Sequence, residues 1–353
     1  MGRATEAKRA APAAPKAAAP AAGGAPASPA RRRLAHALGG AGLLGLGAGG
    51  LLAGCGRSAA PQFDGVTLRL GDQQGMTRLL ADAADALAGL PYQVEWITFP
   101  SPPPLFEAFR GGHVDFTYTN DILALVAATN GLALRLVAAS AGEVGGIGIV
   151  VPAGSPIRSV ADLRGRDVIV STVRGGIADW LLQGALAEAG VDPREVNVSY
   201  ALQNDALTAF QTGRVQAWAT NDPQLFIAQQ SGGRLLRDGT GINSGRGIFV
   251  ASVEALGQAG KRAAIADLLG RLARAREWAN SHLDEFALAY VKRVRFEPEV
   301  ARAMVGRGRV TLGPLDDSVV AELAALDRKL VERGVVAKAI DVNAIVERGV
   351  FGG

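Results

Sequence analysis

Short apolar runs alternate with amphipathic segments along the chain from about residue 65 onward. The runs have the length and β-branched content of buried strands, and the segments between them carry apolar residues at a spacing of three to four, as in helices. The first series of predicted strands is Val66–Leu70, Val94–Phe99, Asp115–Thr119 and Leu134–Ala139, and the helices between them are Met76–Ala88, Leu105–Arg110 and Ile122–Thr129. This alternation predicts an α/β fold with a mostly parallel sheet and flanking helices.

A second series of the same kind begins after Pro152. Its predicted strands are Val168–Ser171, Val196–Ala201 and Ala217–Thr220, and its predicted helices are Ile177–Ala189, Ala206–Thr212 and Gln224–Gln230. From Ala259 onward the pattern is mainly helical, with clear helical spacing in Arg271–Ala279 and Val319–Glu332. We therefore expect two α/β lobes and a helical C-terminal region.

The two series contain an internal match. The segment from Phe109 to Asp121 aligns without gaps with the segment from Phe210 to Asp222, at a constant offset of 101 residues. In both copies a helix ends at a glycine, a strand follows, and Thr-Asn-Asp stands where the strand turns into the next helix. Because ligands of such sheets bind beyond the carboxyl ends of the strands, the two Thr-Asn-Asp turns are expected to face each other across a cleft.

Two apolar segments flank the second series and are candidates for the points where the chain crosses between lobes: Gly145–Pro152 and Gly247–Ser252. Lobe one would then comprise residues 66–150 and 247–353, and lobe two would comprise residues 151–246. A lobe inserted through two strands can pivot about them and close over a ligand.

The N-terminal region has the order of a secretory signal. Residues 1–54 are rich in alanine and proline, then carry the basic cluster Arg31–Arg33 and an apolar stretch, and end in Leu-Ala-Gly before Cys55. This ending resembles a bacterial lipobox, so Cys55 is predicted to be lipidated and residues 55–65 to form a linker. The alternative is a retained transmembrane helix, which seven glycines in the apolar stretch disfavour. Both the general and the twin-arginine export routes stay open.

Charge and composition narrow the possible partners. The chain has 353 residues, 48% of them hydrophobic, and its formal charge of +4 divides into +6 before Cys55 and −2 from Cys55 onward. Without the leader there is no excess positive charge to neutralise phosphates, which argues against nucleic acid as the main partner. The single cysteine excludes an intrachain disulfide and a cysteine-based zinc site.

The sequence contains few candidates for catalysis. The three histidines, His36, His113 and His282, are far apart, and the HExxH, GxSxG and GxxxxGK[ST] motifs are absent. We therefore expect no catalytic residues, no metal and no cofactor. Trp180 and Trp218 are predicted to pack in the core.

Two turns that join a strand to a helix are candidates for binding a small anion, because a helix N-terminus presents free N–H groups and a positive dipole. The candidate residues are Gln73 and Gln74 in the first turn, and Thr172, Arg174, Gly175 and Gly176 in the second. Arg174 would add a bidentate charge. The alternative is that both are ordinary turns with Arg174 in solvent.

The remaining candidates are the residues of the repeated turns: Thr119, Asn120, Asp121, Asn221 and Asp222. The two aspartates are expected to cap the helices that follow them, and Asp222 before Pro223 is a favourable capping arrangement. A second role in the cleft stays open for both.

Three segments carry a resemblance to a known family. They are Phe106–Phe109 with Gly112–Phe116, Pro152–Gly165 (PAGSPIRSVADLRG), and Val215–Ala219 with Asp222-Pro223. Over nearly the whole length after Cys55 the chain resembles the solute-binding proteins of ABC importers for aliphatic sulfonates, taurine and nitrate. The resemblance implies a two-lobed type II periplasmic binding protein fold hinged by two crossing strands.

The resemblance also implies a site. The family's glutamine after the first strand falls on Gln73, its turn in lobe one on Asn120-Asp121, its anion turn in lobe two on Gly175-Gly176-Ile177, and its Asp-Pro turn on Asp222-Pro223. Gly176 and Ile177 stand where the family has serines.

These observations together predict a monomeric, lipid-anchored receptor on the extracytoplasmic face of the cell membrane. It would close two lobes around a small organic anion and deliver it to a membrane permease. Two alternatives stay open: an enzyme on the same fold, of the kind that serves thiamine-pyrimidine synthesis, and a sensor that feeds a signalling partner.

Overall fold

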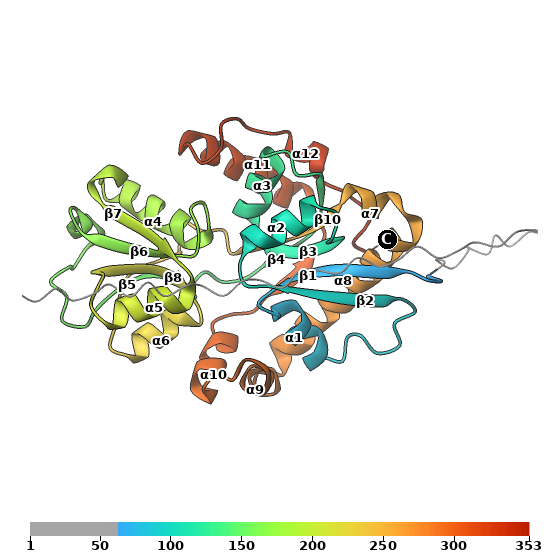
Figure 1. The fold of residues 1–353 in the computed structure, drawn as a ribbon, viewed down its shortest axis with the longest axis horizontal. Coiled ribbons are helices and arrows are strands. Elements are labelled where there is room, and N and C mark those ends of the chain that lie inside the picture. The colour runs from blue at the N-terminus through green and yellow to red at the C-terminus, as the bar shows by residue number, and fades with distance from the viewer. Residues whose placement is uncertain (1–62, 353) are drawn as a thin grey trace, which may run out of the picture. The chain divides into compact units, whose positions relative to one another are not determined.

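The computed structural model describes residues 63–352, which form two β-sheets with helices on both faces of each (Figure 1). The leader, Cys55 and most of the expected linker lie outside the described residues. Sheet A has six strands in the order β11-β4-β10-β3-β1-β2. Its strands are β1 (Thr67–Gln73), β2 (Gln93–Phe99), β3 (Phe116–Asn120), β4 (Leu134–Ala141), β10 (Arg246–Ser252) and β11 (Thr311–Gly313).

Sheet B has five strands in the order β7-β6-β8-β5-β9. Its strands are β5 (Ile147–Val151), β6 (Asp167–Ser171), β7 (Asn197–Ala201), β8 (Ala217–Asn221) and β9 (Arg234–Asp238). We call the part of the chain built on sheet A lobe one and the part built on sheet B lobe two.

The helices cover both faces of the two sheets. Lobe one carries α1 (Met76–Ala83), α2 (Pro102–Arg110), α3 (Asp121–Thr129), α7 (Val253–Gly257), α8 (Ala259–Ser281), α9 (Leu283–Val294), α10 (Pro298–Gly306), α11 (Asp317–Glu332) and α12 (Val342–Ile345). Lobe two carries α4 (Ile177–Glu188), α5 (Gln203–Gln211), α6 (Gln224–Gln230) and the short 3₁₀ turns Val160–Leu163 and Pro193–Glu195.

Strand direction follows the prediction only in part. In sheet A, β2, β1 and β3 are mutually parallel, but β10 is antiparallel to both of its neighbours. In sheet B, β7, β6 and β8 are parallel, and β5 is antiparallel to both of its neighbours. Most strands of each sheet nevertheless share one direction, so the predicted fold class is confirmed, and β5 and β10 run against that direction. The reason is that β5 and β10 are the strands by which the chain enters each sheet from the other one.

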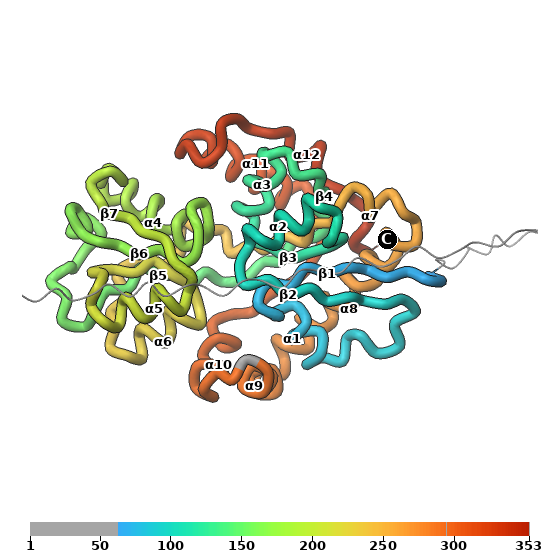
Figure 2. Tube along the Cα trace, viewed as in Figure 1, coloured from blue at the N-terminus to red at the C-terminus, as the bar shows by residue number. Residues whose placement is uncertain are grey.

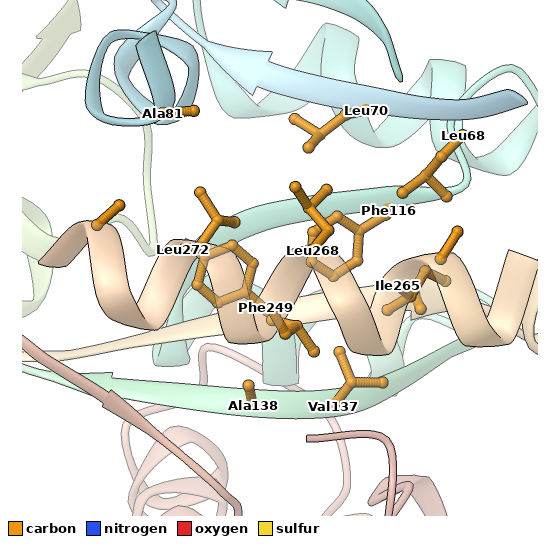
Figure 3. Packing of buried hydrophobic residues seen from close by; sticks show 14 of the residues in the cluster. Leu68, Leu70, Ala81, Phe116, Val137, Ala138, Phe249, Ile265, Leu268 and Leu272 are labelled. Atoms are coloured by element: carbon orange, nitrogen blue, oxygen red, sulfur yellow. The ribbon is translucent and has the colours of Figure 1, made fainter. Parts of the chain in front are cut away.

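The apolar pattern of the sequence explains how sheet A is buried. Leu68 and Leu70 of β1 alternate with polar residues, are fully buried, and meet Phe116 of β3 and the apolar face of α8 (Figure 3). Leu268 of α8 is fully buried against this face. On the opposite face, α2, α3 and α11 enclose a second apolar cluster. Burial on both faces explains why β4 and β10 read as nearly continuous apolar runs.

Sheet B is enclosed in the same way. Helix α4 covers one face, and α5 and α6 cover the other (Figure 1). Trp218 of β8 is fully buried under α5 and α6, and Trp180 of α4 is 2% exposed. The prediction that both tryptophans are core residues is confirmed.

The chain passes between the sheets twice, after β4 and after β9, as the trace shows (Figure 2). The two crossings, residues 142–146 and 239–245, touch where the Gly142 N–H donates a hydrogen bond of 3.0 Å to the Gly245 carbonyl. Gly245 has a φ of +70°, and a Cβ there would lie 2.1 Å from the Gly142 oxygen, so this close approach requires glycine. The predicted crossing strands correspond to β5 and β10, and the crossings immediately precede them.

One predicted helix is shorter in the structure, and two strands of the structure were not predicted. The helix expected to reach Ala88 ends at Ala83, because Asp85 adopts a left-handed conformation (φ 49°) and the Ala86 N–H bonds back to the Ala81 carbonyl. This is a Schellman ending with aspartate in the usual place of glycine. The strands β9 and β11 were not predicted, because β9 reads Arg-Leu-Leu-Arg-Asp and β11 has only three residues.

Candidate functional site

A cavity of about 440 Å³ lies where strands of the two sheets end. Its walls include the last residues of β1 and β3 from sheet A and of β6 and β8 from sheet B. The cavity therefore occupies the position beyond the carboxyl ends of the strands where open α/β sheets bind their ligands.

Most of the residues singled out from the sequence line this cavity. They are Gln73, Gln74, Thr119, Asn120, Asp121, Thr172, Gly176, Asn221 and Asp222. The structure thus brings the two Thr-Asn-Asp turns and the two candidate anion turns to one place.

Arg174 and Gly175 do not line the cavity. The Arg174 side chain is exposed, and its guanidinium lies 5.4 Å from the centre of the Tyr200 ring. Gly175 is buried with a φ of +75°, and its N–H donates to Asp179 at 2.7 Å. The expectation that Arg174 and the Gly175 N–H face an anion is therefore corrected, because the left-handed turn at Gly175 and the Asp179 carboxylate fix this loop in another direction.

The turn after β3 is held by its own polar side chains. Asn120 is the N-cap of α3 and accepts a hydrogen bond of 2.9 Å from the Leu123 N–H. Asp121 is the first residue of the helix, accepts from the Ile122 N–H at 2.8 Å with one oxygen, and accepts from the Ser244 hydroxyl with the other. Asn120 thus caps α3 in place of Asp121. The Asp121 carboxylate instead accepts hydrogen bonds from both α3 and Ser244 of the second crossing.

The turn after β8 is built differently despite its identical sequence. Pro223 occupies the N-cap position of α6, and Asp222 accepts from the Phe226 N–H at 3.2 Å. Asn221 accepts from the Gln203 side chain at 3.3 Å and donates to the Asp222 carbonyl at 2.9 Å. Asp222 thus accepts a hydrogen bond from an N–H in the first turn of α6, as expected for a capping residue. It does so from the position before the N-cap residue Pro223.

Asp222 also forms an ion pair with lobe one. The Nε of Arg307, which follows α10, lies 2.5 Å from Asp222 Oδ2. The same guanidinium donates to the Gly145 carbonyl at 2.9 Å and to the Gln229 side chain at 3.0 Å. Because Gln229 is on α6, Arg307 ties the C-terminal helices of lobe one to lobe two.

The two aspartates share an unusual electrostatic environment. Burial raises the pKa of Asp121 to about 6, against the opposing hydrogen bonds from Ser244 and Ile122. Burial likewise raises the pKa of Asp222 to about 6, against the opposing charge of Arg307. Both groups are therefore mostly ionised at neutral pH but at a desolvation cost, which a ligand with suitable donors can relieve.

The turn after β1 supplies the remaining wall. Asp72 is 1% exposed and accepts from the Thr77 and Arg78 N–H groups at 3.0 Å each, which closes the N-terminus of α1. Burial raises its pKa. The Gln73 side chain donates to the Tyr118 carbonyl at 3.0 Å, and Gln74 is in the left-handed region with a φ of 55°. Since Asp72 already occupies these N–H groups, the N-terminus of α1 offers less to an anion than the sequence indicated.

Several lining residues were not found from the sequence. They are Tyr118, Glu143, Gln203, Asn243, Ser244, Arg246, Tyr290, Phe296 and Met304, among others. Asn243 and Ser244 belong to the second crossing, whose glycines were a usable signal. Tyr290, Phe296 and Met304 come from the α9–α10 region, more than 60 residues away from any predicted site residue, and no local motif marks them.

The charges around the cavity are predominantly negative. Of the lining residues, Asp72, Asp121, Glu143 and Asp222 are acidic and only Arg246 is basic. Arg246 is already paired with Glu322, with Nε 2.5 Å from Oε2. No group of three or more potential metal ligands occurs among residues 63–352.

Comparison with known proteins gives consistent matches. Residues 72–232 match the family described as "ABC transporter, phosphonate, periplasmic substrate-binding protein". An aliphatic sulfonates-binding protein of Escherichia coli (strain K12) is 29% identical over 303 residues, which are 83% of this chain and 92% of the relative.

Two solved structures have a fold similar to that of this chain. The alkanesulfonate-binding protein SsuA from Xanthomonas axonopodis pv. citri, bound to MOPS, superimposes with a TM-score of 0.73 at 27% identity, covering 80% of this chain and 98% of that one. The desulfurization enzyme DSZB has a TM-score of 0.62 at 16% identity, covering 80% of this chain and 97% of that one. The second likeness concerns the fold alone.

Proposed function

We propose that this chain is a periplasmic substrate-binding protein of an ABC transporter, which binds a small organic sulfonate in the cavity between its two sheets and delivers it to a membrane permease. The observation that carries this proposal is the arrangement of the cavity. Its walls come from the strand ends of both lobes, and the lobes are joined by two crossings that meet at Gly142 and Gly245. A ligand that contacts both lobes favours the closed arrangement, which is the form that a permease can distinguish from the empty one.

The size and lining of the cavity support a small ligand. A volume of about 440 Å³ is at the lower end of small-molecule sites, and the walls combine apolar surface from Tyr118, Ile177 and Phe296 with side-chain amides and hydroxyls. This suits a short organic chain with one polar head.

A binding panel tests the proposal. The purified full-length chain is heated with and without alkanesulfonates, nitrate, alkylphosphonates and aromatic carboxylates, each at several concentrations. A ligand at about 100 times its dissociation constant adds about 2.7 kcal/mol to the free energy of unfolding, which gives a clear rise in Tm. A rise with sulfonates supports the proposal, and a rise with only another class of compound overturns the sulfonate assignment.

We further propose that the chain binds its ligand without changing it, although the fold is shared with an enzyme. The cavity lining contains neither cysteine nor histidine. Mass spectrometry of a bound sulfonate after prolonged incubation is expected to return the compound unchanged, and any stoichiometric conversion would contradict this expectation.

The membrane anchor is a separate proposal that rests on the sequence before the described residues. Leu52-Ala53-Gly54 before Cys55 supports cleavage and lipidation at this cysteine. Among residues 63–352, no helix is both long and apolar enough to cross a membrane. Cells grown with radiolabelled fatty acid are expected to label the chain but not its Cys55→Ala variant, and equal labelling of both would exclude Cys55 as the site.

A further inference from the structure

The point where each crossing passes from one lobe to the other can be located from its hydrogen bonds. In the first crossing, the Gly145 carbonyl accepts from the Arg307 guanidinium of lobe one at 2.9 Å. The next carbonyl, that of Gly146, accepts from the Asp222 N–H of lobe two at 2.8 Å. The first crossing is therefore held by lobe one up to Gly145 and by lobe two from Gly146 onward.

The second crossing changes lobes between two neighbouring residues as well. The Asn243 side chain donates at 3.1 Å to the carbonyl of the first residue of α4, in lobe two, whereas the hydroxyl of Ser244 donates to the Asp121 carboxylate of lobe one. We call the peptide units 145–146 and 243–244 the hinge units. A rotation of lobe two that is absorbed by the dihedral angles of the hinge units breaks none of these four hydrogen bonds.

The contact between the lobes beside the second hinge unit is apolar. Trp180 of α4 is 2% exposed, and its ring nitrogen donates to the Ile242 carbonyl of the second crossing at 3.0 Å. The ring belongs to the same apolar cluster as Leu330 and Val336 of lobe one, and the Arg333 guanidinium of lobe one lies 3.9 Å from the ring centre. Separating this apolar surface would expose it to water, which is unfavourable.

The contact beside the first hinge unit is polar. The Arg307 side chain, which is 26% exposed, pairs with Asp222 at 2.5 Å and donates to the Gln229 side chain at 3.0 Å, both in lobe two. Water can replace the partners of these groups once the lobes separate, which is not true of the apolar contact at Trp180. The polar contact is therefore the one that is expected to break when lobe two turns.

The polar contact also lies beside the cavity. Asp222 lines the cavity, and so does Met304 of α10, three residues before Arg307. Among the described residues, neither Trp180 nor Arg333 lines the cavity. Separation of the lobes on the α10 side therefore opens a wall of the cavity.

We propose that Arg307 is the latch of the cavity, a contact that holds the lobes closed. Lobe two turns at the hinge units, keeps its apolar contact at Trp180, and separates from Arg307 to admit or release a ligand. This inference goes beyond the proposed function, because it holds for any ligand of the cavity. The latch sets the proportion of closed molecules, and the apparent affinity for a ligand scales with that proportion.

Distances between spin labels test the direction of opening without any ligand. One label is placed in lobe two by Arg194→Cys, and the other in lobe one by Arg302→Cys in α10 or by Glu332→Cys at the end of α11, all three positions being exposed. The labels are introduced into the full-length chain with Cys55→Ser, so that no other thiol is present. When Arg307→Gln is added, the distance from lobe two to α10 is expected to lengthen and the distance to α11 is not.

Two results would contradict the latch. If both distances lengthen, the lobes move apart as a whole and the apolar contact is not kept. If neither distance changes, Arg307 does not hold the cavity closed. Should Arg307→Gln not fold, Arg307→Lys keeps the charge but loses the planar fork, so it is expected to lengthen the distance to α10 in a smaller share of molecules. Unchanged distances in this second variant would contradict the proposal.

Ligand affinity tests the same latch by a second route, isothermal titration with ethanesulfonate and butane-1-sulfonate as probes. Arg307→Gln is expected to weaken both by the same factor, about threefold or more, and this factor is expected to equal the fall in the closed fraction measured with the labels. Unequal factors would mean that Arg307 acts on the ligand itself, which contradicts the proposal. If neither sulfonate binds to the wild-type chain, the sulfonate assignment fails, and the label distances still decide on the latch.

The matched control is Arg271→Gln. The Arg271 side chain is 18% exposed, pairs with Asp267 at 2.7 Å and donates to two backbone carbonyls, all within lobe one. The change removes a comparable set of contacts and is expected to lower the Tm without changing either label distance or either affinity. An effect equal to that of Arg307→Gln would assign both to a general loss of stability and would contradict the proposal.

Discussion

The guanidinium of Arg307 and the carboxylate of Asp222 meet at 2.5 Å across the boundary between the lobes. Arg307 follows α10 in lobe one, whereas Asp222 ends the repeated turn of lobe two. A second contact between the lobes is a cation–π contact, in which the Arg333 guanidinium of lobe one lies 3.9 Å from the centre of the Trp180 ring of α4. Lobe two is therefore held by the C-terminal region of lobe one as well as by the two crossings.

Replacing Arg307 by glutamine is expected to loosen the contact between lobes. The change leaves the half-buried Asp222 charge without its cation, which is expected to lower the free energy of unfolding by about 1–3 kcal/mol. It is also expected to increase the radius of gyration measured by small-angle scattering in the absence of ligand. The control is Arg302→Gln, because Arg302 pairs with Asp284 at 3.6 Å on an exposed surface. Identical behaviour of the two variants would show that Arg307 does not hold the lobes together.

The titration of Asp121 is expected to make the free energy of unfolding depend on pH. Its pKa is raised by burial from 3.8 to about 6, so the folded chain binds more protons than the unfolded chain between these values. Asp121 therefore lowers stability as pH rises through this window, by about 2–3 kcal/mol once the group is ionised. Urea unfolding at pH 4.5 and pH 7.5 is expected to show Asp121→Asn gaining stability over the wild type at the higher pH. If the difference in the free energy of unfolding between wild type and variant is the same at both pH values, the pKa of Asp121 is not raised in the folded chain.

Asp115 shows the opposite electrostatic behaviour. Although burial acts to raise its pKa, hydrogen bonds from Arg69 and Lys261 outweigh burial and hold the pKa below its usual value. The residue is 2% exposed just before β3, so Asp115→Ala leaves two cations without their anion. We expect this change to cost about 3–5 kcal/mol of unfolding free energy. The wild-type contribution is present above about pH 4 and is lost as pH falls through the lowered pKa, which acid unfolding can follow.

The crossing at Gly245 is expected to tolerate no side chain. Gly245→Ala adds a methyl group 2.1 Å from the Gly142 oxygen at a positive φ, so the two crossings must separate. A loss of about 1–3 kcal/mol and weaker ligand binding are expected. Gly145→Ala is a matched control in the first crossing, because a Cβ there meets nothing within 4 Å. Equal thermal stability of the two variants would exclude this contact as a constraint.

The repeat in the sequence found residues that line the cavity, because it depends on local structure. The two Thr-Asn-Asp turns follow buried strands, and the carboxyl end of a strand places its turn at the edge of a sheet wherever the sheet lies. The same local reasoning failed for Arg174. Its direction depends on the left-handed Gly175 and on the Asp179 carboxylate one helical turn later, and neither is marked by an apolar pattern.

The rest of the site depends on contacts that no local pattern encodes. Arg307 lies 85 residues after its partner Asp222, and Ser244 lies 123 residues after Asp121. The expectation that Asp121 is a simple cap was wrong for a related reason. A capping motif is read from a few neighbouring residues, whereas Ser244 reaches this carboxylate only because the second crossing returns beside β3.

The hydrogen bond between Gly142 and Gly245 has a consequence for how such a chain can be rearranged. The chain leaves lobe one after Gly142 and returns to it at Gly245. These two residues are neighbours in space, because a hydrogen bond joins their backbones. Joining residue 142 directly to residue 245 would therefore leave β4 and β10 paired as neighbours, with no gap to span. A gene could therefore be built in which the segment between residues 142 and 245 encodes a different ligand-binding lobe. The order of the strands in sheet A would stay the same.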